Sequence, residues 1–202
     1  MKAMKVIISL ALIAGWSLAA CAPASQPTTA PKAIPTEAPA NVSTAGSAQA
    51  VDPQNATYLI DGKEVTLVNG SAEQEAAPGS ATKVVTKYFG NAVDIDLNSD
   101  GLMDSAFLLT QDGGGSGTFF YTAAALNQAG STQGTNAIFL GDRIAPQSTN
   151  VDPNNPVQFI VNYLDRKASD PMSAQPSMAV SRTLKLDDGK LVEVGTPPTQ
   201  TP

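Results

Sequence analysis

Oxygen-bearing side chains gather in one short segment of this 202-residue chain. Counted from Asp96, they stand at positions one, three, five and nine, with a glycine at position six and one more carboxylate, Asp94, just upstream. A hard cation such as Ca²⁺ takes about six to eight oxygen ligands, which short acidic and amide side chains on a tight curl can supply. The segment therefore predicts a calcium site, with ligands Asp94, Asp96, Asn98, Asp100, the backbone carbonyl of Leu102, and Asp104.

The charge pattern around this segment also favours a bound cation. Four carboxylates lie between Asp94 and Asp104, whereas no Lys or Arg occurs between Lys87 and Arg143. Anions without a local counter-charge disfavour their own ionised forms, and a divalent cation removes that repulsion. We expect a structural role for the ion, with affinity on the order of 10⁻⁴ to 10⁻³ M. A solvated turn that binds no ion is the alternative interpretation.

The spacing from Asp96 to Asp104, Asp-x-Asn-x-Asp-Gly-x-x-Asp, resembles the calcium loops of dockerins, thrombospondin type 3 repeats and FG-GAP repeats. It departs from the EF-hand, because the twelfth position is Phe107 where that motif has a bidentate Glu. We therefore expect strands, and not two helices, on either side of the loop.

The composition excludes most familiar hydrolase chemistry. The chain has no histidine and one cysteine, Cys21, which excludes Ser–His and Cys–His pairs, imidazole-ligated zinc and internal disulfides. Its formal charge is −6, and an acidic surface repels phosphate, so we expect no nucleic-acid partner. We predict no catalytic residue, and a non-enzymatic role is favoured.

The first 21 residues carry the features of a lipoprotein leader. Two lysines precede an apolar run over 6–16, which is too short for a membrane span of about 20 apolar residues. The segment Leu18-Ala19-Ala20-Cys21 resembles the lipobox of bacterial lipoproteins. This implies removal of 1–20 and attachment of palmitate-type chains to Cys21, on the cell membrane or outer membrane, facing the periplasm or exterior. An ordinary secretory signal that leaves a free thiol is the alternative.

Composition then divides the rest of the chain into a tether, one domain and a tail. Residues 21–50 are rich in Ala, Pro, Thr and Ser and bury too little apolar surface to fold, so we expect a disordered tether. Residues 196–202 are expected to form a second disordered segment. Between them, 51–195 is long enough for a single domain with its own core.

The domain is predicted to be mainly β, an antiparallel sheet or small sandwich with long loops. Asp-Gly pairs at 61–62 and 188–189 favour tight primed turns and predict hairpins over 58–68 and 184–194. Residues 81–89 fit either a short helix or a strand. Further strands are predicted at 106–110, 118–126, 137–140 and 157–163.

Two other segments are interpreted as structural. The glycine-rich stretch 112–118 lacks the Lys of a phosphate-binding loop and is predicted to be a hairpin turn. Asp142 and Arg143 are predicted to form a local ion pair, with a ligand-binding pair as the alternative.

The segments 65–70, 107–111, 114–119 and 140–143 together resemble a group of uncharacterised bacterial exported lipoproteins. The resemblance implies domain limits and location, and no activity. We expect a lipid-anchored envelope protein that binds calcium for stability and contacts an envelope protein or polysaccharide. A carboxylate-dependent hydrolase of cell-wall polysaccharide and a solute-binding lipoprotein stay open as alternatives.

Overall fold

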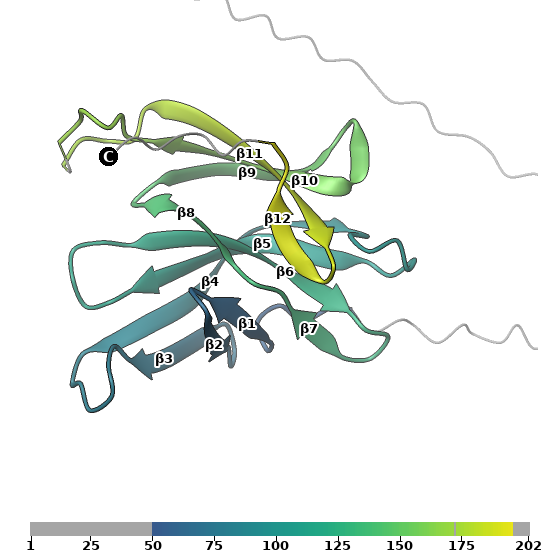
Figure 1. Ribbon diagram of the computed structural model, residues 1–202, viewed down its shortest axis with the longest axis horizontal. Coiled ribbons are helices and arrows are strands. Elements are labelled where there is room, and N and C mark those ends of the chain that lie inside the picture. Colours follow the sequence, from purple (N-terminus) through teal and green to yellow (C-terminus); the bar gives the residue numbers. More distant parts are fainter. Residues whose placement is uncertain (1–49, 172, 196–202) are drawn as a thin grey trace, which may run out of the picture. The chain divides into compact units, whose positions relative to one another are not determined.

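The computed structural model describes residues 50–171 and 173–195, a part of the chain with twelve strands and no helix (Figure 1). The strands are β1 (Thr57–Ile60), β2 (Lys63–Thr66), β3 (Ser71–Glu75), β4 (Lys83–Ile95), β5 (Asp104–Asp112), β6 (Phe119–Asn127), β7 (Thr132–Gly134), β8 (Ile138–Asp142), β9 (Ala145–Asp152), β10 (Asn155–Asp165), β11 (Met178–Asp187) and β12 (Lys190–Glu193). Every pairing between them is antiparallel, which confirms the predicted mainly β architecture. The predicted leader, Cys21, the tether as far as residue 49 and the tail lie outside the described residues.

The larger sheet is built around β5. Its strands follow the order β3-β4-β5-β6-β7, and β8 pairs with β6 on the same edge as β7. In β5, Phe107 and Leu109 belong to a buried cluster on one face, while Ala106 and Leu108 belong to another on the opposite face. A sheet that is apolar on both faces needs a covering layer on each side.

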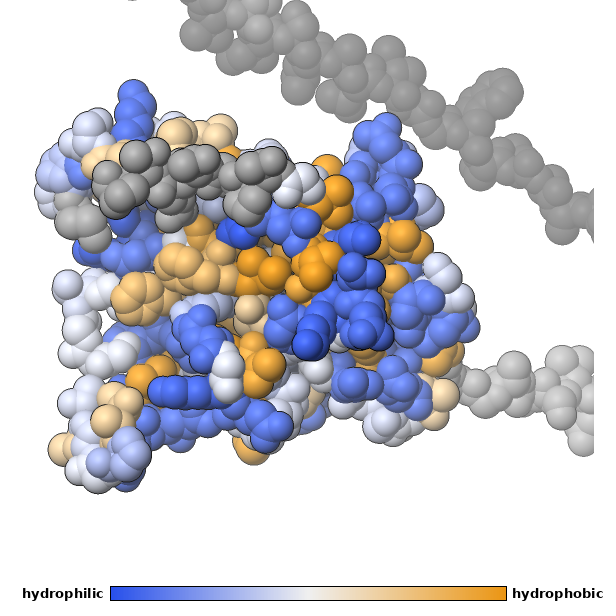
Figure 2. Space-filling view, viewed as in Figure 1, coloured by the Kyte–Doolittle hydropathy of each residue, from blue (hydrophilic) through white to orange (hydrophobic). Residues whose placement is uncertain are grey.

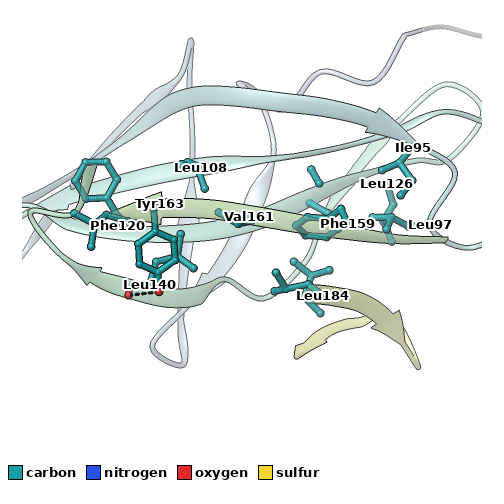
Figure 3. Packing of buried hydrophobic residues seen from close by; sticks show 14 residues of the cluster. Ile95, Leu97, Leu108, Phe120, Leu126, Leu140, Phe159, Val161, Tyr163 and Leu184 are labelled. Carbon is teal, nitrogen blue, oxygen red and sulfur yellow. Dashed lines mark hydrogen bonds between the residues drawn. The ribbon is translucent and has the colours of Figure 1, made fainter. Parts of the chain in front are cut away.

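The four-stranded sheet, in the order β12-β11-β10-β9, covers one face of the larger sheet. Phe159, Val161 and Leu184 of this second sheet have no exposed surface, and they share a buried cluster with Leu108 and Phe120. Figure 3 shows these side chains meeting between the two layers. Burial of one such side chain contributes roughly 1.5–3 kcal/mol, so this inter-sheet core is a major source of stability.

The β1–β2 hairpin covers the opposite face. Tyr58 packs edge-on against Phe107, with ring centroids 5.5 Å apart, and Ile60 is buried in the same cluster. At the turn, Asp61 and Gly62 have φ of 49° and 77°, and two positive values are what a type I′ turn requires. The predicted hairpin is confirmed, as is the second one, β11–β12.

Close contacts hold the β1–β2 hairpin against the larger sheet and join the segment between β7 and β8 to β12. Asn136, between β7 and β8, forms an isolated parallel bridge with Leu59 of β1. Its amide donates to the carbonyl of Leu191 on β12 at 3.0 Å, and the N–H of Leu191 donates back to Asn136 Oδ1 at 2.8 Å. At Gly134 a Cβ would stand 2.2 Å from the carbonyl oxygen of Thr57, so β7 and β1 approach without room for a side chain.

The segment 81–89 forms a strand and not a helix. Most of it belongs to β4, a 13-residue strand whose register with β5 is irregular around Gly90. The run Val84-Val85-Thr86 is β-branched, which favours extended backbone, and these residues pair with β3 on one side. The predicted turn at 112–118 is also confirmed, since it joins β5 to β6.

We expect Gly134→Ala to lower the free energy of unfolding by about 1–3 kcal/mol, because the new Cβ must displace β1. Gly115→Ala is the matched control, since nothing lies within 4 Å of a Cβ at that position. Urea unfolding followed by circular dichroism measures both variants. Equal stabilities would show that β1 and β7 are not in close contact.

Candidate functional site: an acidic loop and an aromatic pocket

The predicted calcium loop connects β4 to β5 and is curled by its own side chains. The carboxylate of Asp96 accepts the backbone N–H groups of Asp100 at 3.2 Å and of Gly101 at 3.0 Å. Ser99 and Gly101 adopt the left-handed conformation, with φ of 60° and 83°, so the chain turns sharply where the sequence places its glycine. Asp100 accepts the N–H of Leu102 at 2.8 Å.

Asp104, the last predicted ligand, is fully buried at the start of β5. One of its oxygens accepts the N–H of Leu97 at 2.9 Å and the other accepts the N–H of Asn127 at 2.8 Å. Burial raises the pKa of the Asp104 carboxyl, the two N–H donors oppose that rise, and the charges of Asp100 and Asp96 add to it. Asp104 therefore ties the loop to the end of β6, within electrostatic reach of two other acids.

The structure brings together part of the predicted ligand set. Asn98 lies against Asp100, donating its amide to Oδ2 at 2.8 Å and accepting the Asp100 N–H at 3.1 Å. Asp94 instead lies within β4, opposite Ser105 of β5. Among residues 50–171 and 173–195, no three or more carboxylate, imidazole or thiol side chains are arranged as a metal centre. Apart from the bond between Asp104 and the Asn127 N–H, the bonds described above join the loop's oxygens to its own N–H groups.

Asp142 and Arg143 form the predicted local ion pair. The Arg143 guanidinium donates from Nη2 to Asp142 Oδ2 at 2.8 Å. The other oxygen of Asp142 accepts the N–H of Thr118 at 3.0 Å. The pair fixes the end of β8 beside the start of β6, which is a structural role.

A pocket that the sequence analysis did not predict lies on the larger sheet. It measures about 480 Å³ and is lined by Asp61, Val84, Gln111, Gly113, Phe119, Tyr121 and Phe139, and we call it the aromatic pocket. Pockets that hold small ligands commonly measure about 300–1,000 Å³ and combine apolar walls with a few polar groups. Phe119 and Phe139 keep 39% and 41% of their surface exposed, so their rings are accessible.

A hydrogen bond orders the polar side of the aromatic pocket. The Tyr121 hydroxyl donates to Asp61 Oδ2 at 2.7 Å, linking β6 to the β1–β2 turn. Burial, followed by this bond and the nearby negative charge, raises the pKa of Tyr121, so the hydroxyl keeps its proton. Asp61 is therefore held in place through Oδ2, and its second oxygen, Oδ1, accepts no hydrogen bond from the described residues.

The sequence does carry one signal of this pocket. Phe119 and Tyr121 are two residues apart on a strand, so both rings stand on the same face. Their neighbours Asp61, Gln111 and Phe139 come from three other parts of the chain, and only strand pairing brings them together.

We expect Asp104→Asn to lower the free energy of unfolding by about 1–3 kcal/mol. An Asn side chain has one oxygen where Asp104 has two, so its NH₂ group would face one of the two buried N–H donors. Asp112→Asn is the matched control, since that exposed side chain accepts one N–H, from Gly114. Thermal unfolding in a calcium-free buffer measures both variants. A stability for Asp104→Asn equal to that of the control would contradict the two-donor arrangement.

No protein-family model, no curated protein and no solved structure matches the chain. Within the described residues, no helix has the length and apolar character needed to cross a membrane. What the domain does must therefore be inferred from the chemistry of the acidic loop and the aromatic pocket.

Proposed function

We propose that the protein is a lipid-anchored component of a bacterial cell envelope, whose domain binds a partner without transforming it. The lipobox-like segment ending at Cys21 supports the anchor. Each buried methylene of an acyl chain contributes about 0.8 kcal/mol, so several chains give durable attachment. The Pro-rich segment before residue 50 would then hold the domain away from the bilayer.

One observation carries the binding role: acidic side chains of the domain bond to its own framework, while the aromatic pocket keeps accessible rings. Asp104 holds two N–H groups, Asp142 holds Arg143, and Glu193 holds Arg182 at 2.6 Å. A glycoside hydrolase needs two carboxyls facing each other, roughly 5–9.5 Å apart. The described lining of the aromatic pocket includes one carboxylate, Asp61. A polysaccharide hydrolase is therefore less well supported than a binding module.

The proposal includes a structural calcium ion at the acidic loop. Asp96, Asn98 and Asp100 would supply side-chain oxygens, Leu102 its carbonyl, and Asp104 and Asp94 would add carboxylates at the loop's two ends. The donors fit, since they are oxygens of the kind that Ca²⁺ prefers, already placed on a tight curl. A bound cation would relieve the repulsion among Asp96, Asp100 and Asp104 and so stabilise the connection between β4 and β5.

We expect calcium to raise the melting temperature of the wild-type chain, because an ion that binds the folded state stabilises that state over the unfolded one by mass action. Calorimetric titration should show saturable binding that Asp100→Asn weakens at least tenfold. Asp188→Asn, at the exposed Asp-Gly turn of β11–β12, is the control and should bind as wild type does. Binding that is unchanged by Asp100→Asn would refute the site.

We expect the protein from its native host to begin at an acylated Cys21 and to fractionate with membranes. Mass spectrometry of the N-terminal peptide measures the modification directly. Cys21→Ser should move the protein into the soluble fraction without changing the stability of the domain. An unmodified residue 21 in the wild-type protein would overturn the proposed anchor.

A further inference from the structure

The aromatic pocket lies where the β1–β2 hairpin stops covering the larger sheet. Phe119 and Tyr121 of β6 lie on the same sheet face as Phe107 and Leu109 of β5, which the hairpin buries. The hairpin ends at its Asp61 turn, and beyond that point the face is open. Figure 2 shows apolar side chains at the surface in a band over the region where Figure 1 labels β8.

Three aromatic rings form the floor of the pocket in a stepped row. Tyr121 and Phe139 meet edge-on across the β6–β8 pair, with centroids 5.4 Å apart and ring planes at 60°. The rings of Phe139 and Phe119 are tilted by 48°, with centroids 6.3 Å apart. Arg182 donates to the backbone carbonyl of Phe139 and is itself held by both oxygens of Glu193. The backbone at Phe139 is therefore held by the framework.

Polar groups stand beside this row at two places. Asp61 presents Oδ1 next to the oxygen that holds Tyr121. Gln111 donates its amide to Thr86 Oγ1 at 3.1 Å, which orients the side chain and directs its carbonyl oxygen away from that bond. A ligand that carries hydroxyl donors would find two oriented acceptors beside an apolar floor.

The pocket continues along the sheet. A smaller hollow of about 90 Å³ shares Asp61, Val84 and Gln111 with it. This hollow runs along the β1–β2 hairpin, beside Lys63, to Gln74 and Glu75 of β3. The charges along both hollows balance: Asp61 lies near Lys63, which also lines the smaller hollow, and Glu75 pairs with Lys83 at 3.5 Å. The lining therefore offers no net charge that would favour an anionic or a cationic ligand. Both hollows together suit an elongated, uncharged ligand with apolar faces and hydroxyl edges.

We propose that the aromatic pocket binds a neutral oligosaccharide segment of an envelope polysaccharide, with sugar faces stacked on Phe119 and Phe139 and hydroxyls donating to Asp61 and Gln111. Pyranose rings have apolar C–H faces and hydroxyl edges, which match the floor and the acceptors of the pocket. The inference rests on the proposed binding function and deepens it by naming the partner. It does not depend on calcium or on the lipid.

The test uses the whole mature chain, carrying Cys21→Ser for solubility, with cellotetraose and N-acetylchitotetraose as probes. Nitrogen-15 correlation spectra should show saturable shifts at the pocket residues, with a dissociation constant below about 1 mM for at least one probe. The tetrasaccharide should bind at least tenfold more tightly than its monosaccharide, because the site is elongated. Phe119→Ala, Phe139→Ala and Asp61→Asn should each weaken binding about tenfold or more.

Phe89→Ala is the matched control, since Phe89 is an exposed strand aromatic whose ring packs on Phe120, away from the pocket lining. Each variant's spectrum reports whether it is folded, and Asp61→Asn keeps both the turn and an acceptor for Tyr121. No saturable shift with either probe at about 10 mM would overturn the inference. So would binding that all three pocket variants leave unchanged, or binding of dodecanoate in place of the sugars.

The same titration in calcium and in chelator separates this inference from the calcium proposal. Sugar binding in both buffers, together with no calcium uptake, would refute the ion and keep the saccharide site. Calcium uptake and an acylated Cys21 without sugar binding would refute the saccharide site and keep the anchored, calcium-stabilised domain.

Discussion

The domain depends on a sheet that must be covered on both faces. β5 carries Phe107 and Leu109 on one side and Ala106 and Leu108 on the other, and none of the four has exposed surface. The four-stranded sheet buries a large core on one face, whereas a hairpin of two four-residue strands covers only part of the other. The aromatic pocket is the part of this face that the hairpin does not reach, so the site follows from the way in which the sheet is covered.

The acidic loop is attached to the same sheet, between β4 and β5, and combines stabilising hydrogen bonds with crowded negative charges. Its curl is stabilised by the N–H groups that Asp96 and Asp100 accept, while Asp104 carries a buried charge into the base of β5. Two N–H bonds oppose the effect of burial on the Asp104 carboxylate, but they leave in place its repulsion by Asp96 and Asp100. The loop's own hydrogen bonds thus support its curl, and the repulsion among its carboxylates gives it an electrostatic reason to bind a cation.

Local patterns in the sequence predict the elements that have local causes. The two Asp-Gly hairpins and the apolar strands β5, β6 and β10 were identified because turn chemistry and hydrophobic runs decide them. β3, with the polar sequence SAEQE, was missed, since its pairing with β4 and not its composition makes it a strand. The spacing of the acidic loop was visible, but the bond from Asn127 to Asp104 spans 23 residues and has no local signal. The aromatic pocket was missed because the spacing of Phe119 and Tyr121 is its one local signal, and the rest of its lining joins them only through the fold.

Asn136 joins the earliest and the latest strands of the domain, since it meets Leu59 on β1 and exchanges two hydrogen bonds with Leu191 on β12. During synthesis from the N-terminus, the β1–β2 hairpin is complete long before Leu191, the hydrogen-bond partner of Asn136, has been made. Pairing over such separations is entropically slow, and the bond that joins both ends forms only after nearly the whole domain has been made. The domain therefore stays incompletely folded until its last strand is available.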